Sequence, residues 1–231
     1  MSYLGTPLGY IFASIFLSMS ASLTFYFGRF FERGIADLQS FFEYHPWLYL
    51  LLMPAIAMRL WAEERKTGTF ELLITLPITV GEAVVGKFLA AWIFSGGVLA
   101  LSFPLWVTVN YLGNPDNGVI LCTYLASWLM AGGFLALSSC ASAVTNNQVI
   151  AFIIAVTICF LFMMTGVEII QVGLRDWAPV WATETIASLS IMTNFTAVSQ
   201  GVIDIRNLFY FVSLISLSLA VNTKIIELKK V

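Results

Sequence analysis

Six long apolar runs, separated by short polar links, constrain what this chain can fold into more than any other feature. About 20 helical residues, each rising 1.5 Å, cross the hydrocarbon core of a bilayer. Hydrophobic residues make up 59% of the chain and charged residues 10%, against about 45–50% and about 25% in soluble domains. The composition therefore predicts an all-α integral membrane protein, folded as one transmembrane domain over residues 1–231. We expect membrane-spanning helices near residues 7–28, 47–61, 80–112, 118–143, 148–171 and 207–226.

Two of the expected spans have unusual lengths. The second, 47–61, is short; Pro54 can kink it, and its charged end can continue toward Glu63. The third, 80–112, is longer than a bilayer requires. We expect it to tilt, to bend near Pro104 or to begin in the membrane interface.

The lysines predict the orientation in the membrane. An even number of crossings places both termini on one side, together with the connection between the second and third spans. Because cytoplasmic loops are rich in Lys and Arg, we expect this side to be the cytoplasm, in a bacterial cytoplasmic (inner) membrane. The start MSYLGTPLGYIF lacks a basic region and a cleavage site, so the first span is expected to remain as an anchor. The lysines on this side are Lys66, Lys87, Lys224, Lys229 and Lys230.

The connection between the second and third spans offers a cytosolic partner more surface than the other cytoplasmic segments do. Residues 145–148 form only a turn, and the C-terminal KIIELKKV is a short basic tail suited to a membrane surface. We therefore expect a cytosolic partner to bind within residues 59–82.

Charged residues at helical spacing begin this connection. Arg59 and Glu63 are four residues apart and Glu63 and Lys66 three apart, so paired charges can carry the second span into water as a helix. Gly68 then interrupts the pattern. We expect the chain to bend there.

A short amphipathic helix is expected after the bend. Thr69 can cap its start and Pro77 limits its length, while Thr79 and Glu82 form a T-x-x-E capping box that opens the third span. Such a helix suits a transporter whose soluble motor pushes on its spans, or simply a loop that lies on the membrane surface; both readings remain open. Its apolar residues are Phe70, Leu72, Leu73 and Leu76.

The run MRLWAEERKTGTFELLITLPITVGEAVVGKFLAAW resembles the signature region of ABC-2 type transporter permeases. Three later runs, YLGNPDNGVILCTYLASWL, SSCASAVTNNQVIAFII and QGVIDIRNLFYF, resemble the gliding-motility-type branch of that family. The resemblance implies the ABC-2 exporter (type V ABC) fold, with six transmembrane helices and a cytosolic coupling helix between the second and third. It also implies a permease subunit that works as a dimer, with a second permease copy or a related permease, above two ATP-binding subunits.

The resemblance assigns roles within residues 62–79, which we call the coupling segment. Glu64 and Arg65 are expected to make polar contacts with the ATPase, Gly68 to form the bend, and Phe70 and Leu73 to act as apolar plugs. Many relatives carry a longer helix before the first span, and here only about six residues precede it, so any contact from that region is expected to be minimal. The full set expected at the ATPase is Glu63, Glu64, Arg65, Gly68, Thr69, Phe70, Glu71 and Leu73.

Other chemical signals are weaker. Residues 81–88, GEAVVGKF, match a phosphate-binding loop except that Phe88 stands where a magnesium-binding hydroxyl belongs, so the ATPase is expected to be a separate polypeptide. The three cysteines show no metal or disulfide spacing, and His45 is expected to be solvated or to cap a helix. We expect no enzyme activity, no cofactor, no metal and no nucleic-acid partner.

Glu168 and Gln171, near the outer end of the fifth span, are a weak candidate for a translocation path or gate, because an ionisable group at membrane depth is costly. Residues 172–206 are expected to form interfacial or re-entrant helices or packed loops. Gly96, Gly97, Gly132 and Gly133, with the run of serine and alanine from Ser138 to Ala143, are expected to let helices approach closely.

Two other functions remain open beside that of an exporter permease. One is a membrane scaffold or anchor of a motility or cell-envelope machine; the other is an ion-coupled transporter, which the absence of charged residues from the central spans disfavours. Membrane lipid and a large extracytoplasmic subunit complete the expected partners.

Overall fold

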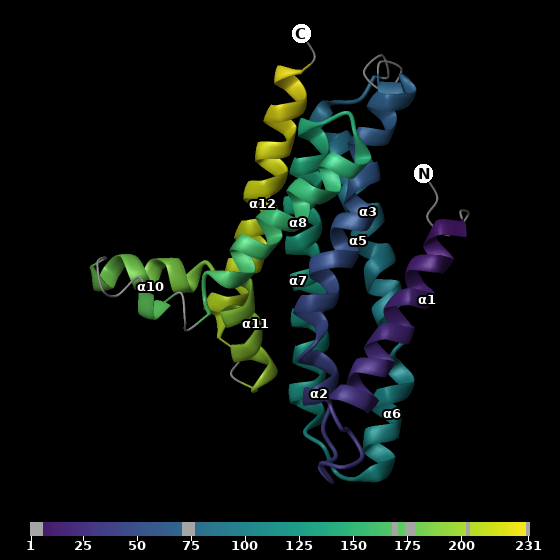
Figure 1. The fold of residues 1–231 in the computed structure, drawn as a ribbon, viewed down its shortest axis with the longest axis vertical. Helices are drawn as coiled ribbons and strands as arrows, with labels where there is room; N and C mark the ends of the chain where they lie inside the picture. The colour runs from purple at the N-terminus through teal and green to yellow at the C-terminus, as the bar shows by residue number, and fades with distance from the viewer. Residues whose placement is uncertain (1–6, 71–76, 168–170, 174–178, 202–203, 230–231) are drawn as a thin grey trace.

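The structure is a computed structural model that describes residues 7–70, 77–167, 171–173, 179–201 and 204–229, and these residues contain helices and no strands (Figure 1). The elements are α1 (Pro7–Ser22), continued by the π-helical turn η2 (Leu23–Phe27), then α2 (Gln39–Phe42), α3 (His45–Thr67), α5 (Val80–Ala100), α6 (Phe103–Leu112), α7 (Asn117–Val144), α8 (Gln148–Met164), α10 (Val180–Ser188), α11 (Ile191–Ser199) and α12 (Ile205–Leu228). The predicted all-helical class is confirmed.

Four helical stretches of the described chain are long and apolar enough to cross a membrane: Gly9–Phe27, Val80–Leu112, Asn117–Val144 and Ile205–Leu228. α8 is apolar but has 17 residues, and α3 has 23 residues but ends in a charged sequence. A multi-pass membrane protein follows from these lengths, whereas crossings by α3 and α8 stay predictions.

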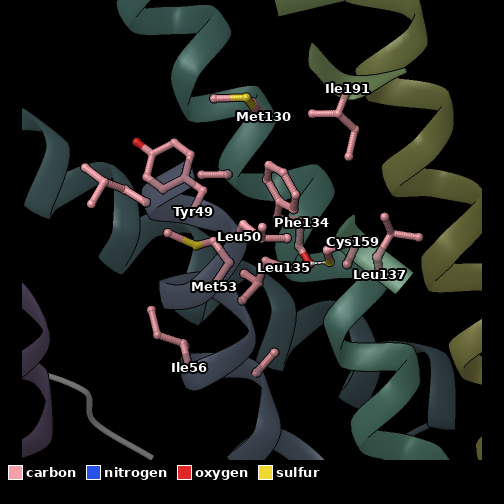
Figure 2. Packing of buried hydrophobic residues seen from close by; sticks show 14 of the residues in the cluster. Tyr49, Leu50, Met53, Ile56, Met130, Phe134, Leu135, Leu137, Cys159 and Ile191 are labelled. Atoms are coloured by element: carbon pink, nitrogen blue, oxygen red, sulfur yellow. Dashed lines mark hydrogen bonds between the residues drawn. The ribbon is translucent and has the colours of Figure 1, made fainter. Parts of the chain in front are cut away.

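α7 is the central helix of the bundle. It contacts α3, α12, α8, α11 and α5, and 61% of its most apolar window is buried inside the protein, against 22–33% in the other three long apolar helices. Figure 2 shows Met130, Phe134 and Leu135 of α7 facing Tyr49 and Met53 of α3. Dispersion contacts between such closely packed side chains hold helices together where lipid replaces water.

Two expected spans differ from the helices observed. The third is interrupted at Leu101 and Ser102, just before Pro104, so the predicted bend near this proline is confirmed. The fifth was expected to reach residue 171, but α8 ends at Met164. The start of α11 packs directly against the chain just after α8: a Cβ on Gly166 would lie 2.4 Å from the hydroxyl oxygen of Ser190, which caps α11. This close packing explains why the chain turns after Met164.

A tryptophan pair joins α5 to α7. The indole N–H of Trp92 donates to the carbonyl oxygen of Trp128 at 2.8 Å, the indole of Trp128 donates to the carbonyl of Trp92 at 3.1 Å, and the two rings stack with centroids 4.5 Å apart. Gly96 and Gly132 make room for this pair, because a Cβ on either would lie within 2.7 Å of the opposite indole nitrogen.

The expectation of close packing is therefore right for Gly96 and Gly132. It also holds for Gly133, where a Cβ would lie 3.2 Å from Leu214 of α12. At Gly97 a Cβ would meet nothing within 4 Å, so a close helix contact there stays a prediction.

His45 is fully buried, so the expectation of a solvated or capping histidine is wrong. Its Nδ1 lies 2.8 Å from the Ser127 hydroxyl, which also contacts the Tyr49 hydroxyl at 3.0 Å. The rings of Phe41 and Phe42 in α2 pack edge-on against the imidazole. His45 does begin a helix, α3, as expected, but the short helix α2 covers its side chain.

The stretch between α8 and α12 contains two short helices within its described part. α10 projects from the side of the bundle, whereas α11 lies beside α12 (Figure 1) and packs against α7, α8 and α12. Helices were one of the two expectations for this stretch, and residues 180–188 and 191–199 are helical.

Candidate functional site

Five helix ends meet at one end of the bundle, which we call the lysine-rich end. They are the C-terminal ends of α3, α7 and α12 and the N-terminal ends of α5 and α8, and hydrogen bonds join several of them. Figure 1 shows the C-terminus leaving from this end. The described lysines, all at this end, are Lys66, Lys87, Lys224 and Lys229.

α3 continues without interruption into the coupling segment and ends at Gly68. Gly68 has φ 73°, a left-handed conformation, and its N–H donates to the Arg65 carbonyl at 3.4 Å. Glycine is favoured at this position after a helix because it has no Cβ to resist positive φ. The predicted bend is confirmed, and it results from backbone conformation alone, since a Cβ here would meet nothing within 4 Å.

Glu64 is paired inside the protein. Its carboxylate forms a salt bridge with the Lys87 ammonium of α5, with both side chains less than 20% exposed. The same ammonium donates to the Leu60 carbonyl at 2.8 Å and lies 3.8 Å from the Trp61 ring centroid. The pair therefore fixes the charged end of α3 to the start of α5, and Glu64 has little surface left for a partner.

Arg65 joins the coupling segment to the end of α7. Its Nη1 donates to the Ala143 carbonyl at 2.6 Å, and its guanidinium carbon lies 4.8 Å from the centroid of Phe70, which is buried. The last carbonyls of a helix have no intrahelical donor, so this cation satisfies one of them. The Nη2 atom is buried and has no hydrogen-bond partner.

Serines of α7 complete the connection to α3 and α12. The indole N–H of Trp61 donates to Ser139 at 3.3 Å, and the amide of Asn222 in α12 donates to the same hydroxyl at 2.6 Å. Ser142 donates to the Met58 carbonyl of α3 at 3.0 Å. Sequence reasoning treated these serines only as small residues that allow close packing, and it missed their polar role; their spacing of three on one helix face was the available signal.

Glu63, Lys66 and Thr69 present the more open surface of the segment. Lys66 and Thr69 are exposed and Glu63 is half-buried, with one carboxylate oxygen buried and unpartnered. The expected pairs of Glu63 with Arg59 and Lys66 are wrong: the described ion pairs at this end are Glu64–Lys87 and Lys224–Glu227. Arg59 and Glu63 are each half-buried, and each has a buried side-chain atom without a hydrogen-bond partner.

The hydroxyl of Thr69 lies 2.9 Å from that of Thr67 and contacts the Glu64 carbonyl at 3.4 Å. The expected cap would act on residues 71–76, which lie outside the described residues together with Glu71 and Leu73. The predicted capping box is confirmed, since the Thr79 N–H donates to Glu82 at 2.8 Å and the Glu82 N–H donates to the Thr79 hydroxyl at 3.3 Å.

The phosphate-loop-like sequence GEAVVGK has helical geometry. It forms the first two turns of α5 from Val80 onward, whereas a phosphate-binding loop curls its backbone amides around the anion. Lys87, which would reach the phosphates, is held by Glu64.

The weak outer candidate is only partly described. Gln171 donates to the Thr165 carbonyl at 2.6 Å and thus closes the turn after α8. Glu168 lies outside the described residues.

Comparison with known protein families identifies a family to which the chain belongs. The family model for ABC-2 family transporter protein matches residues 48–224, which is more than half of the chain and includes the coupling segment and the lysine-rich end as far as Lys224 of α12. No curated protein matches the chain.

Proposed function

Because the chain belongs to the ABC-2 family of transporter proteins, and is therefore a membrane component of an ABC transporter, we propose that it is the permease subunit of an exporter. In this proposal it forms the translocation path and couples ATP hydrolysis by a separate ATPase subunit to export. Family membership supports a partnership with an ABC ATPase in general. The chain itself has no catalytic role in this proposal.

The observation that carries the proposal is the fixation of the end of α3 to three neighbouring helices. Glu64 is paired with Lys87 of α5, Arg65 binds the end of α7, and Trp61 meets Asn222 of α12 through Ser139. A force applied just beyond Thr67 would therefore move four helices together. A loop that merely lay on the membrane surface would not need a poorly exposed ion pair at its base.

This arrangement divides the coupling segment into two parts. Glu64, Arg65 and Phe70 anchor it to the bundle, and the more open Lys66 and Thr69 offer surface to the ATPase. The roles expected from the family therefore change: Glu64 and Arg65 would transmit force more than they bind the ATPase directly.

A charge exchange between Glu64 and Lys87 tests the anchoring role. Glu64→Lys leaves two cations in a poorly exposed place, which costs about 3 kcal/mol when a buried pair is broken. We expect the ATPase subunit still to co-purify, because the exposed Lys66 and Thr69 are unchanged. We expect its ATPase activity, however, no longer to depend on the permease. The double variant Glu64→Lys/Lys87→Glu should recover much of that dependence.

The control is Lys224→Glu, which disrupts an exposed pair with Glu227 at the same end; exposed pairs contribute little, so it should behave like the unmodified protein. Equal coupling in Glu64→Lys and the unmodified protein would contradict the anchoring role. A transport assay in reconstituted vesicles separates the exporter from the scaffold alternative. A scaffold complex would hydrolyse ATP without moving any solute across the vesicle membrane.

A further inference from the structure

A cavity of about 420 Å³ opens at the lysine-rich end, beside the bend that ends α3. Its lining is cationic: Arg65 and Lys229 contribute two positive charges and Asn146 an amide, and the described lining residues include no carboxylate. The lining residues are Arg65, Gly68, Phe70, Asn146 and Lys229. A concave site with convergent donors and uncompensated positive charge favours an anion.

Both cations approach the C-terminal end of α7. Arg65 donates to the Ala143 carbonyl at 2.6 Å, and Lys229 donates to the Val144 carbonyl. These carbonyls carry only a partial negative charge, and neither cation forms an ion pair with a described residue. Arg65 Nη2 also remains buried without an acceptor, a state that costs free energy unless something binds there.

The two cations disfavour one another. The pKa of the Lys229 ammonium is lowered, first by desolvation and then by the nearby Arg65 charge, and desolvation lowers the pKa of Arg65 as well. The carbonyl oxygens that face the two cations come from α7, and the described residues that line the cavity supply no carboxylate. A bound anion would offset this repulsion.

The surroundings favour an anion that carries hydrocarbon. Phe70 provides an apolar wall, and large apolar side chains are exposed nearby at the same helix ends, where the bundle leaves the membrane: Val144 (49% exposed), Val149 (64%) and Leu228 (78%). A free phosphate ion would gain nothing from these side chains. A lipid can place its headgroup on the cations and its acyl chains along them.

We propose that this cavity binds the phosphate group of an anionic phospholipid from the leaflet next to the lysine-rich end. Arg65 uses its planar fork on the phosphate oxygens, Lys229 adds a second charge, and Asn146 adds an amide donor. Basic pockets between transmembrane helices bind such headgroups in general. The lipid would thereby tie the ends of α3, α7 and α12 together at the base of the coupling segment.

The test is a titration of the purified full chain with phosphatidylglycerol, followed by native mass spectrometry. Lys229→Gln should weaken lipid binding about fivefold, the effect of one basic residue near an anionic surface, and Lys229→Arg should retain binding. The matched control is Lys224→Gln, on the same helix but exposed and outside the cavity, which should bind as the unmodified protein does. Unchanged thermal unfolding of Lys229→Gln confirms that it is folded.

Three results would overturn the proposal. The first is equal phosphatidylglycerol binding by Lys229→Gln and Lys224→Gln. The second is competition by millimolar inorganic phosphate as effective as that by the lipid, which would assign the cavity to free phosphate. The third is loss of ATPase co-purification in Lys229→Gln with lipid binding unchanged, which would assign it to an acidic group of the ATPase.

Discussion

Arg65 shows how one side chain can link the coupling segment to a neighbouring helix of the bundle. The planar guanidinium places one face near the Phe70 ring, at 4.8 Å, while an edge N–H reaches the Ala143 carbonyl at 2.6 Å. A lysine ammonium could reach the carbonyl but could not stack in the same way, so an arginine is the better residue here. The side chain therefore fixes the direction in which the chain leaves α3, just before the bend at Gly68.

Gly68 provides a prediction at the scale of one residue. Since its φ is 73° and the space around it is open, a substitution is penalised only through the backbone. We expect Gly68→Val to cost about 1–3 kcal/mol locally and to reduce co-purification of the ATPase, with membrane insertion unchanged. Gly68→Asn is the control, because asparagine tolerates the left-handed region. If the valine variant recovers as much ATPase as the asparagine variant, the bend has no part in docking.

At the scale of elements, local sequence predicts several helix boundaries, whereas tertiary contacts determine the others. The T-x-x-E sequence predicts the start of α5, and Gly68 predicts the end of α3. Pro104 predicts the break between α5 and α6. The end of α8 depends on the close approach of Ser190 to Gly166, and the burial of His45 depends on α2. Residues far apart in sequence cause these features, so no local pattern contains them.

In the candidate site, too, the sequence predicts some features and tertiary packing determines others. The family signature located the coupling segment, but the partner of Glu64 is Lys87, 23 residues away, and not a neighbour one helical turn away. Local rules suggested the pairs Arg59–Glu63 and Glu63–Lys66 because they consider one helix at a time. The packing of α5 against α3 decides which carboxylate is paired.

The tryptophan pair gives a prediction for the contact between α5 and α7. Gly96→Leu should displace the Trp128 indole, because even a Cβ would lie 2.6 Å from its nitrogen, and it should destabilise the bundle by about 1–3 kcal/mol. Gly97→Leu, one residue later and facing open space, is the matched control. Thermal unfolding in detergent measures the difference, and equal midpoints for the two variants would show that the pair does not hold the helices together.

At the scale of the whole molecule, one central helix connects both ends of the protein. α7 contacts α3, α5, α8, α11 and α12. Motion of the coupling segment at the end of α3 can therefore pass through α7 to α11. The four lysines within the described residues lie at the end that carries the coupling segment, and Asp116, which caps the start of α7, lies at the opposite end. This asymmetry supports an orientation with both termini in the cytoplasm.

Accessibility to a membrane-impermeant thiol reagent measures that orientation. In a background without the three natural cysteines, Lys66→Cys should be labelled only from the cytoplasmic side and Asp116→Cys only from outside, since both positions are exposed. Labelling of Lys66→Cys in intact cells would reverse the topology and remove the lysine-rich end from the reach of a cytosolic ATPase.

Site-specific photocrosslinking in the complex with the ATPase subunit tests the central claim most directly. A photoreactive residue in place of Lys66, at the exposed end of α3, should crosslink to the ATPase. The same residue in place of Asp116 should not, and in place of Lys224, on the exposed face of α12, it should crosslink much less. Crosslinking from position 66 confirms that the coupling segment receives the ATPase; crosslinks from 224 or 116 with none from 66 would contradict it.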